Sequence, residues 1–236
     1  MVDKFFLALD YETVDDVVSK GSSALYFLLC EYGRDFIPRL GVKINQDLLT
    51  GPIDKRYRKF NDEGYSIFAD MKISHGYGTG RRIIKRLLKH LPIDYVTVSA
   101  NLGRGILKKY VEIGKQHEVN VIAWTIHTKT SPADAERMHK QSLSDAMFNF
   151  VQIASEAGCD AAVMEARMLQ DKRIRKLPIK KLVTGIRIDP SNKGTQKRVS
   201  SVEELKNLKQ HFDYAVISSR YLYNFDLLGE VIDALR

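Results

Sequence analysis

The chain has 236 residues, 44% of them apolar, which is enough for one large domain with a full core or for two small domains. Its net charge of +8 favours anionic partners such as phosphorylated metabolites. The chain has only two cysteines and no C-x-x-C pair, which disfavours a disulfide framework or a metal site. No apolar run is long enough to span a membrane, so no membrane association is expected. We expect a cytoplasmic protein, because the N-terminus lacks a signal-peptide pattern and two thiols fit a reducing compartment.

Apolar runs and amphipathic stretches alternate along the first half of the chain. Thr13, with Asp16 three residues later, predicts a helix start, and Pro92 predicts a helix end. The largely apolar, alternating run from Tyr65 to Ile73 predicts a buried strand. In order, we expect strand 5–10, helix 13–32, strand 36–44, a mixed segment 47–61, strand 65–73, helix 80–91 and strand 95–99.

The same alternation continues through the second half. Ser200, with Glu203 three residues later, has the spacing of a capping box and predicts another helix start. The preceding segment, 188–199, is long and polar, which is typical of a loop. In order, we expect helix 105–117, strand 119–126, a polar loop 127–134, helix 135–157, strand 161–164, a short basic helix, strand 182–187, the capped helix, strand 214–218 and helix 227–235.

Eight strands that alternate with helices, without a linker or a low-complexity segment, predict a parallel (β/α)8 TIM barrel. We expect one domain that spans residues 1–236. An open, doubly wound sheet is the alternative. The first strand-to-helix turn lacks the G-x-G-x-x-G fingerprint, which disfavours a dinucleotide-binding fold of that kind.

Charged residues gather at the ends of the first three predicted strands. Asp70 and Lys72 lie two residues apart on one strand, so their side chains project to the same side. Asp10 ends the first strand, and Lys43 lies near the end of the second. In a barrel these strand ends share one mouth, where two acids and two lysines would compensate one another's charge. A purely structural ion pair is the alternative interpretation of Asp70 and Lys72.

A phosphate site is predicted near the last two strands. Gly185 allows close backbone approach, and Ser219 with Arg220 supplies a hydroxyl and a guanidinium that can bind phosphate in a bidentate manner. Gln196 lies in the long loop that would close over such a ligand. The alternative is a flexible surface loop with an incidental arginine.

Basic residues are dense at 81–89 and 171–181, and these stretches are typical of solvated helix faces. No aromatic residues interleave with them to stack on bases, so a nucleic-acid partner is disfavoured. It would be tested by binding to DNA or RNA at low salt.

Taken together, these motifs resemble the orotidine 5′-phosphate decarboxylase family nearly end to end. Asp70-Met71-Lys72 resembles the D-x-K of the family's D-x-K-x-x-D signature, and Thr79 fits the segment that follows. The other matches are Asp10 with the ribose-contacting acid, Lys43 with the second-strand lysine, Ser131 with the serine that meets the pyrimidine, and Gly185, Gln196, Ser219 and Arg220 with the phosphate elements.

The resemblance implies decarboxylation of orotidine 5′-monophosphate to uridine 5′-monophosphate, without a cofactor, in pyrimidine biosynthesis. Asp70 would crowd the substrate carboxylate, Lys72 would stabilise and protonate the C6 carbanion, and Lys43 would hold Asp70 and the ribose. It also implies a homodimer with shared active sites. A magnesium-dependent sugar-phosphate branch of the family has an acid on the second strand, where this chain has Lys43, so no metal is expected.

The sequence departs from the signature at its third charged position, where His75 replaces an acid that serves the neighbouring subunit's site. Ser99, Thr184 and Ser219 also stand where the family frequently has other residues. Loss of the acid predicts a slower decarboxylase, by roughly 10³-fold or more. Two alternatives remain open: other chemistry on a nucleotide or sugar phosphate with His75 as a proton carrier, or a non-catalytic nucleotide-phosphate binder.

Overall fold

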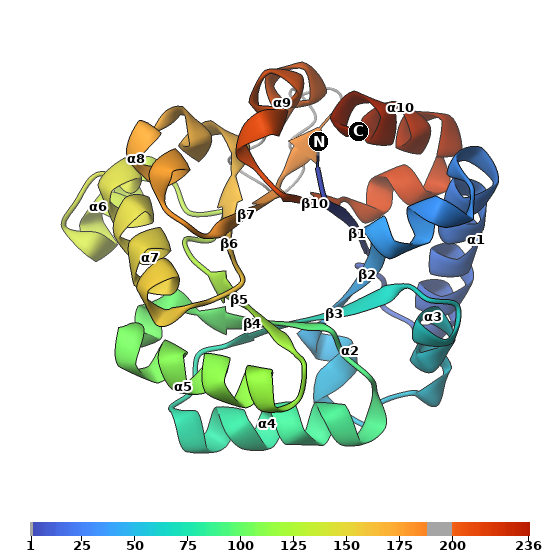
Figure 1. Cartoon of the computed structure of the whole chain (residues 1–236), viewed down its shortest axis with the longest axis horizontal. Helices are drawn as coiled ribbons and strands as arrows, with labels where there is room; N and C mark the ends of the chain where they lie inside the picture. The colour runs from blue at the N-terminus through green and yellow to red at the C-terminus, as the bar shows by residue number, and fades with distance from the viewer. Residues whose placement is uncertain (1, 188–199) are drawn as a thin grey trace.

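The computed structural model describes residues 2–187 and 200–236. Eight parallel strands close into a barrel, in the order β1-β10-β7-β6-β5-β4-β3-β2, and helices surround it (Figure 1). The predicted (β/α)8 fold is therefore confirmed. The barrel strands are β1 (Lys4–Ala8), β2 (Leu40–Asn45), β3 (Ser66–Ile73), β4 (Tyr95–Ser99), β5 (Asn120–Trp124), β6 (Ala161–Glu165), β7 (Lys180–Thr184) and β10 (Tyr214–Ile217).

The helices follow the strands in sequence and cover the outside of the barrel (Figure 1). They are α1 (Val14–Tyr32), α2 (Gln46–Thr50), α3 (Arg58–Asp62), α4 (Tyr77–His90), α5 (Arg104–Gln116), α6 (Pro132–His139), α7 (Leu143–Ala157), α8 (Lys172–Lys176), α9 (Val202–Leu208) and α10 (Phe225–Leu235). Two short strands, β8 (Ile186–Arg187) and β9 (Ser200–Ser201), pair with each other outside the barrel. None of the described helices is long and apolar enough to span a membrane.

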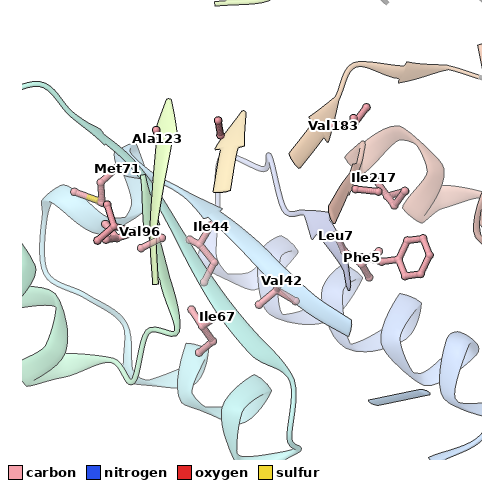
Figure 2. Close-up of a cluster of buried hydrophobic side chains, with 14 of the residues drawn as sticks. Phe5, Leu7, Val42, Ile44, Ile67, Met71, Val96, Ala123, Val183 and Ile217 are labelled. Atoms are coloured by element: carbon pink, nitrogen blue, oxygen red, sulfur yellow. The ribbon is translucent and has the colours of Figure 1, made fainter. Parts of the chain in front are cut away.

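Two apolar layers hold the barrel together. Side chains that point outward from the strands pack against the helices, and Figure 2 shows members of this layer from β2 and β3, including Val42, Ile44 and Ile67. A second, smaller cluster contains Phe6, Phe68 and other residues that alternate with the outward-facing ones. The rings of Phe6 and Phe68 meet edge to face with centroids 5.0 Å apart. This packed interior supports the charged residues farther along the same strands.

Local chemistry explains where the predicted boundaries were right. Thr13 is the N-cap of α1, and its side chain accepts a hydrogen bond from the backbone N–H of Asp16, as the sequence predicted. The predicted stop at Pro92 is also close, because α4 ends at His90.

Three predicted boundaries were wrong. Residues 34–39 form a 3-10 helix, and β2 starts only at Leu40, because Pro38 has no backbone N–H to offer a strand ladder. The predicted helix 135–157 is two helices, since Lys140 adopts a left-handed conformation with φ of 55°. The capping box is formed by Ser201 and Glu204, one residue later than predicted.

Candidate functional site

A cavity of about 680 Å³ opens at the carboxyl ends of the barrel strands. In (β/α)8 barrels, this is the end at which chemistry takes place. Its wall includes polar residues from β1 to β4 on one side and from β7 and β10 on the other. The lining residues that carry charge or a hydrogen-bonding group include Asp10, Lys43, Asn45, Asp70, Lys72, Thr97, His127, Thr128, Lys129, Thr184, Ser218, Ser219 and Arg220.

Lys43 joins the first three strands through its ammonium group. Its Nζ lies 3.0 Å from Asp10 Oδ1, 2.6 Å from Asn45 Oδ1 and 3.2 Å from Asp70 Oδ2. Gly41, Lys43 and Asn45 alternate with the outward-facing Val42 and Ile44, so the period of the strand directs the lysine inward. The sequence prediction that Asp10, Lys43 and Asp70 meet at one mouth agrees with these distances.

Asp70 lies between two lysines. Its Oδ2 is 2.7 Å from Lys72 Nζ and 3.2 Å from Lys43 Nζ, and its side chain is 12% exposed. Burial alone raises the pKa of Asp70, but Lys43, Lys72 and the Thr97 hydroxyl outweigh it and lower that pKa to about 2. Asp70 is therefore an anion at any physiological pH.

The pKa of Lys43 is shaped by the same contest of effects. Burial lowers the pKa of its ammonium, but the carboxylates of Asp70 and Asp10 raise that pKa by more than burial lowers it. The pKa of Lys43 therefore lies above its ordinary value. The Lys43–Asp70 pair therefore keeps both charges, and the cavity wall carries a fixed row of alternating charge from Asp10 to Lys72.

The predicted phosphate residues line the opposite part of the same cavity. Gly185 follows β7 with φ of +79°, a conformation that favours glycine, and Ser219 and Arg220 follow β10. Because β7 and β10 are neighbours in the barrel, these three residues share one side of the mouth. Gln196 lies outside the described residues.

Three predicted site residues do not line the cavity. His75 is exposed, and its backbone carbonyl accepts a hydrogen bond from the Tyr110 hydroxyl. Thr79 is exposed in the first turn of α4, where its hydroxyl accepts from Arg82. Ser131 caps α6, with its hydroxyl 2.6 Å from Asp134 Oδ2 and accepting from the Asp134 N–H.

Sequence reasoning missed several residues that line the cavity. Asn45 could have been found, because it lies two residues after Lys43 on the same strand and must face the same side. Trp124 ends β5, and His127 follows it in a segment whose polar sequence predicts only a loop. Tyr11 and Tyr223 meet edge to face at the rim of the cavity, with centroids 5.9 Å apart. This contact joins the β1 and β10 ends, and nothing in the local sequence indicates it.

Residues 2–187 and 200–236 contain no cluster of three or more His, Cys, Asp or Glu side chains that could hold a metal ion. The cavity does hold a set of groups suited to a negatively charged small molecule. The fold and the site therefore define a protein of the (β/α)8-barrel enzyme class, with a Lys43–Asp70–Lys72 array at the carboxyl-terminal mouth of the barrel.

Comparison with known proteins gives the family. The chain matches the orotidine 5′-phosphate decarboxylase / HUMPS family over residues 3–224. It is 32% identical to an orotidine 5′-phosphate decarboxylase of Fusobacterium nucleatum subsp. nucleatum over 210 residues, which cover 85% of this chain and 82% of the relative. It is 28% identical to the enzyme of that name from Malacoplasma penetrans, over 89% of this chain and 87% of the relative. The chain belongs to the orotidine 5′-phosphate decarboxylase / HUMPS family.

Solved structures agree on the fold. The orotidine 5′-phosphate decarboxylase of Lactobacillus acidophilus superposes with a TM-score of 0.73 at 18% identity, and the match covers 99% of both chains. The orotidine 5′-monophosphate decarboxylase of Methanocaldococcus jannaschii, in complex with the inhibitor BMP, also gives 0.73, at 16% identity over the whole of both chains.

Proposed function

We propose that this protein decarboxylates orotidine 5′-monophosphate to uridine 5′-monophosphate without a cofactor, as a cytoplasmic step of pyrimidine biosynthesis. Family membership supports the reaction class. The observation that carries the proposal is the ionised Asp70 between Lys43 and Lys72 in the wall of the cavity. These charges are fixed before substrate arrives, and a preorganised charge array of this kind is an effective way to stabilise a charged transition state.

The array fits the steps of the reaction. The bond between C6 of the pyrimidine and its carboxylate breaks, carbon dioxide leaves, and the electron pair stays on C6. The Asp70 carboxylate opposes the substrate carboxylate, whereas the Lys72 ammonium favours the developing negative charge on C6. Lys72 then transfers a proton to C6 and regains one from water, so atoms and charge balance.

The direct test is an ultraviolet assay of orotidine 5′-monophosphate consumption by the purified protein. We expect turnover above the uncatalysed reaction. An absence of turnover at high enzyme concentration would reject the proposal. If uridine 5′-monophosphate still bound tightly, the protein would be a non-catalytic nucleotide-phosphate binder.

The phosphate half of the site gives a separate prediction. Arg220→Ala removes the guanidinium beside Ser219 and Gly185, and we expect the Kd for uridine 5′-monophosphate to rise by about 10²-fold, because a charge-assisted hydrogen bond is lost. Isothermal titration calorimetry with uridine, which lacks the phosphate, should show little change. Arg167→Ala is the matched control, since Arg167 pairs with Glu204 and is outside the lining residues. An equal loss of affinity for uridine and for its monophosphate would contradict the assignment.

We further propose that the protein acts as a homodimer in which His75 faces the partner's site. His75 is exposed, lies between β3 and α4 and is not among the residues that line the cavity of its own subunit, whereas Asp70 and Lys72 lie on β3 a few residues earlier. The exposed side chain is therefore available for contact with a neighbouring subunit. Sedimentation of the purified protein should show a dimer, and a monomer at assay concentrations would reject this arrangement.

His75→Asp should raise kcat for orotidine 5′-monophosphate by roughly 10- to 10³-fold, since it adds a carboxylate where the family signature has one. The measurement is steady-state kinetics of both proteins at the same pH. His75→Asn is the matched control, as it alters the side chain without adding charge and should leave kcat near that of the unaltered protein. If activity depended on His75 as a proton carrier, both variants would lose it instead.

A further inference from the structure

Thr97 makes hydrogen bonds to both Asp70 and Lys72, the two residues to which the proposed reaction assigns the main roles. It lies in the middle of β4, faces the barrel interior and is 1% exposed. Its hydroxyl donates to Asp70 Oδ1 at 2.9 Å, and the same oxygen accepts the backbone N–H of Lys72 at 2.7 Å. One side chain from a neighbouring strand therefore contacts both halves of the Asp70–Lys72 pair.

The backbone explains why Lys72 needs such a contact. Ala69 pairs with Val96 and Ile73 with Val98, so β3 carries a bulge opposite Thr97. Within this bulge Lys72 has φ of +45°, a left-handed conformation that is strained for a residue with a β-carbon. Because its N–H bonds to the Thr97 side chain, that interaction holds the strained turn and hence the direction of the lysine.

Thr97 also fixes the carboxylate. Both lysines contact Oδ2 of Asp70, and the Thr97 hydroxyl occupies Oδ1. A carboxylate with both oxygens occupied cannot rotate about its terminal torsion without breaking a hydrogen bond. The Thr97 hydroxyl therefore opposes the rotation that would carry Oδ2 of Asp70 away from Lys72, although it contacts neither lysine's ammonium group.

We propose that Thr97 is a positioning residue, which sets the geometry of Asp70 and Lys72 for proton transfer to the substrate carbon. The inference rests on the proposed decarboxylation for its kinetic consequence. Its structural content, one hydroxyl that couples a carboxylate to the backbone of the proton donor, is independent of the substrate.

Thr97→Val keeps the shape of the side chain and removes the hydroxyl. We expect kcat for orotidine 5′-monophosphate to fall roughly 10- to 100-fold, as is typical for a lost hydrogen bond to a charged group, with KM changed by less than about threefold. Thr97→Ser keeps the hydroxyl and should restore most of kcat. Thr125→Val is the matched control: Thr125 is a buried threonine next to β5 whose hydroxyl donates to the Val163 carbonyl, and Thr125 itself, unlike Val163, is not among the cavity-lining residues. Its kcat should stay near that of the unaltered protein.

A second readout does not require turnover. The carboxyl carbon of Asp70, observed by nuclear magnetic resonance in protein labelled with ¹³C at aspartate, reports the titration of Asp70 beside Lys43, Lys72 and the nearby Asp10. Removal of the Thr97 hydroxyl should move that midpoint upward by about one pH unit, because a hydrogen bond to the ionised form is lost. Thr97→Ser should leave it in place.

The two readouts separate the two proposals. If the unaltered protein fails to consume orotidine 5′-monophosphate, the proposed function falls while the Asp70 titration still decides the role of Thr97. An unchanged midpoint in Thr97→Val would overturn that role, and so would a Thr97→Ser variant as slow as Thr97→Val. A Thr125→Val variant that lost as much kcat as Thr97→Val would also overturn it, since the loss would then be general to buried threonines.

Discussion

Lys72→Ala is expected to lower kcat for orotidine 5′-monophosphate by at least about 10⁴-fold. The substitution removes both the charge that stabilises the C6 carbanion and the proton that C6 receives. Each of these two contributions typically raises the rate of an enzyme by about 10²-fold or more. The measurement is the ultraviolet assay, extended to single-turnover conditions so that slow chemistry remains visible. Retention of more than about a hundredth of kcat would mean that another group protonates C6.

The variant should remain folded, which makes the loss interpretable. Asp70 keeps Lys43 as a partner at 3.2 Å, so the buried carboxylate does not lose all of its counter-charge. Lys181→Ala is a matched control, because Lys181 is a buried strand lysine that donates to the Leu177 carbonyl and is absent from the cavity lining. It should retain kcat, and both variants should give similar circular dichroism and bind uridine 5′-monophosphate.

Much of this fold was predictable because its signals are local. Thr13 and Asp16 form a cap within four residues, and the alternation of Val42 and Ile44 with Lys43 fixes which side of β2 faces the interior. Lys140 shows the opposite case. Its left-handed conformation divides α6 from α7, yet a lysine gives no sequence signal for it, because the preference for such a turn belongs to glycine and asparagine.

The residues of the candidate site also fall into those that the sequence predicts and those that it does not. Lys43, Asp70 and Lys72 were predictable from the period of the strands and from the rule that barrel strands end at one mouth. The contacts of Thr97 with Asp70 and Lys72 were not predictable, because they depend on the register between β3 and β4 and on the bulge opposite Thr97. Register is a property of two strands together, and a single sequence segment does not encode it.

Asp70→Asn is expected to separate the two ways in which Asp70 can act. If the charge of Asp70 opposes the substrate carboxylate, the substitution should lower kcat by roughly 10³-fold or more. It should also strengthen binding of orotidine 5′-monophosphate relative to uridine 5′-monophosphate, because only the former has a carboxylate on its base. If Asp70 only positions Lys72, both nucleotides should bind with the same change in affinity. Calorimetry with the product, and single-turnover kinetics with the substrate, give the two dissociation constants.

The same substitution should change how stability depends on pH. The pKa of Asp70 is about 2 in the folded protein, against an ordinary value of 3.8, so the unfolded state binds protons first as pH falls. The stabilisation is therefore complete above about pH 4 and is lost as pH falls toward 2, and its size is on the order of 2 kcal/mol. Denaturant unfolding at pH 6 and at pH 3 should show about half of this loss in the unaltered protein, because pH 3 lies between the two pKa values, and a smaller loss in Asp70→Asn. At pH 6 the variant should itself be less stable, because Lys72 and Lys43 then face each other without the carboxylate between them. Equal slopes of unfolding free energy against pH in the two proteins would show that Asp70 titrates alike in the folded and unfolded states, which is incompatible with an anion held between two lysines.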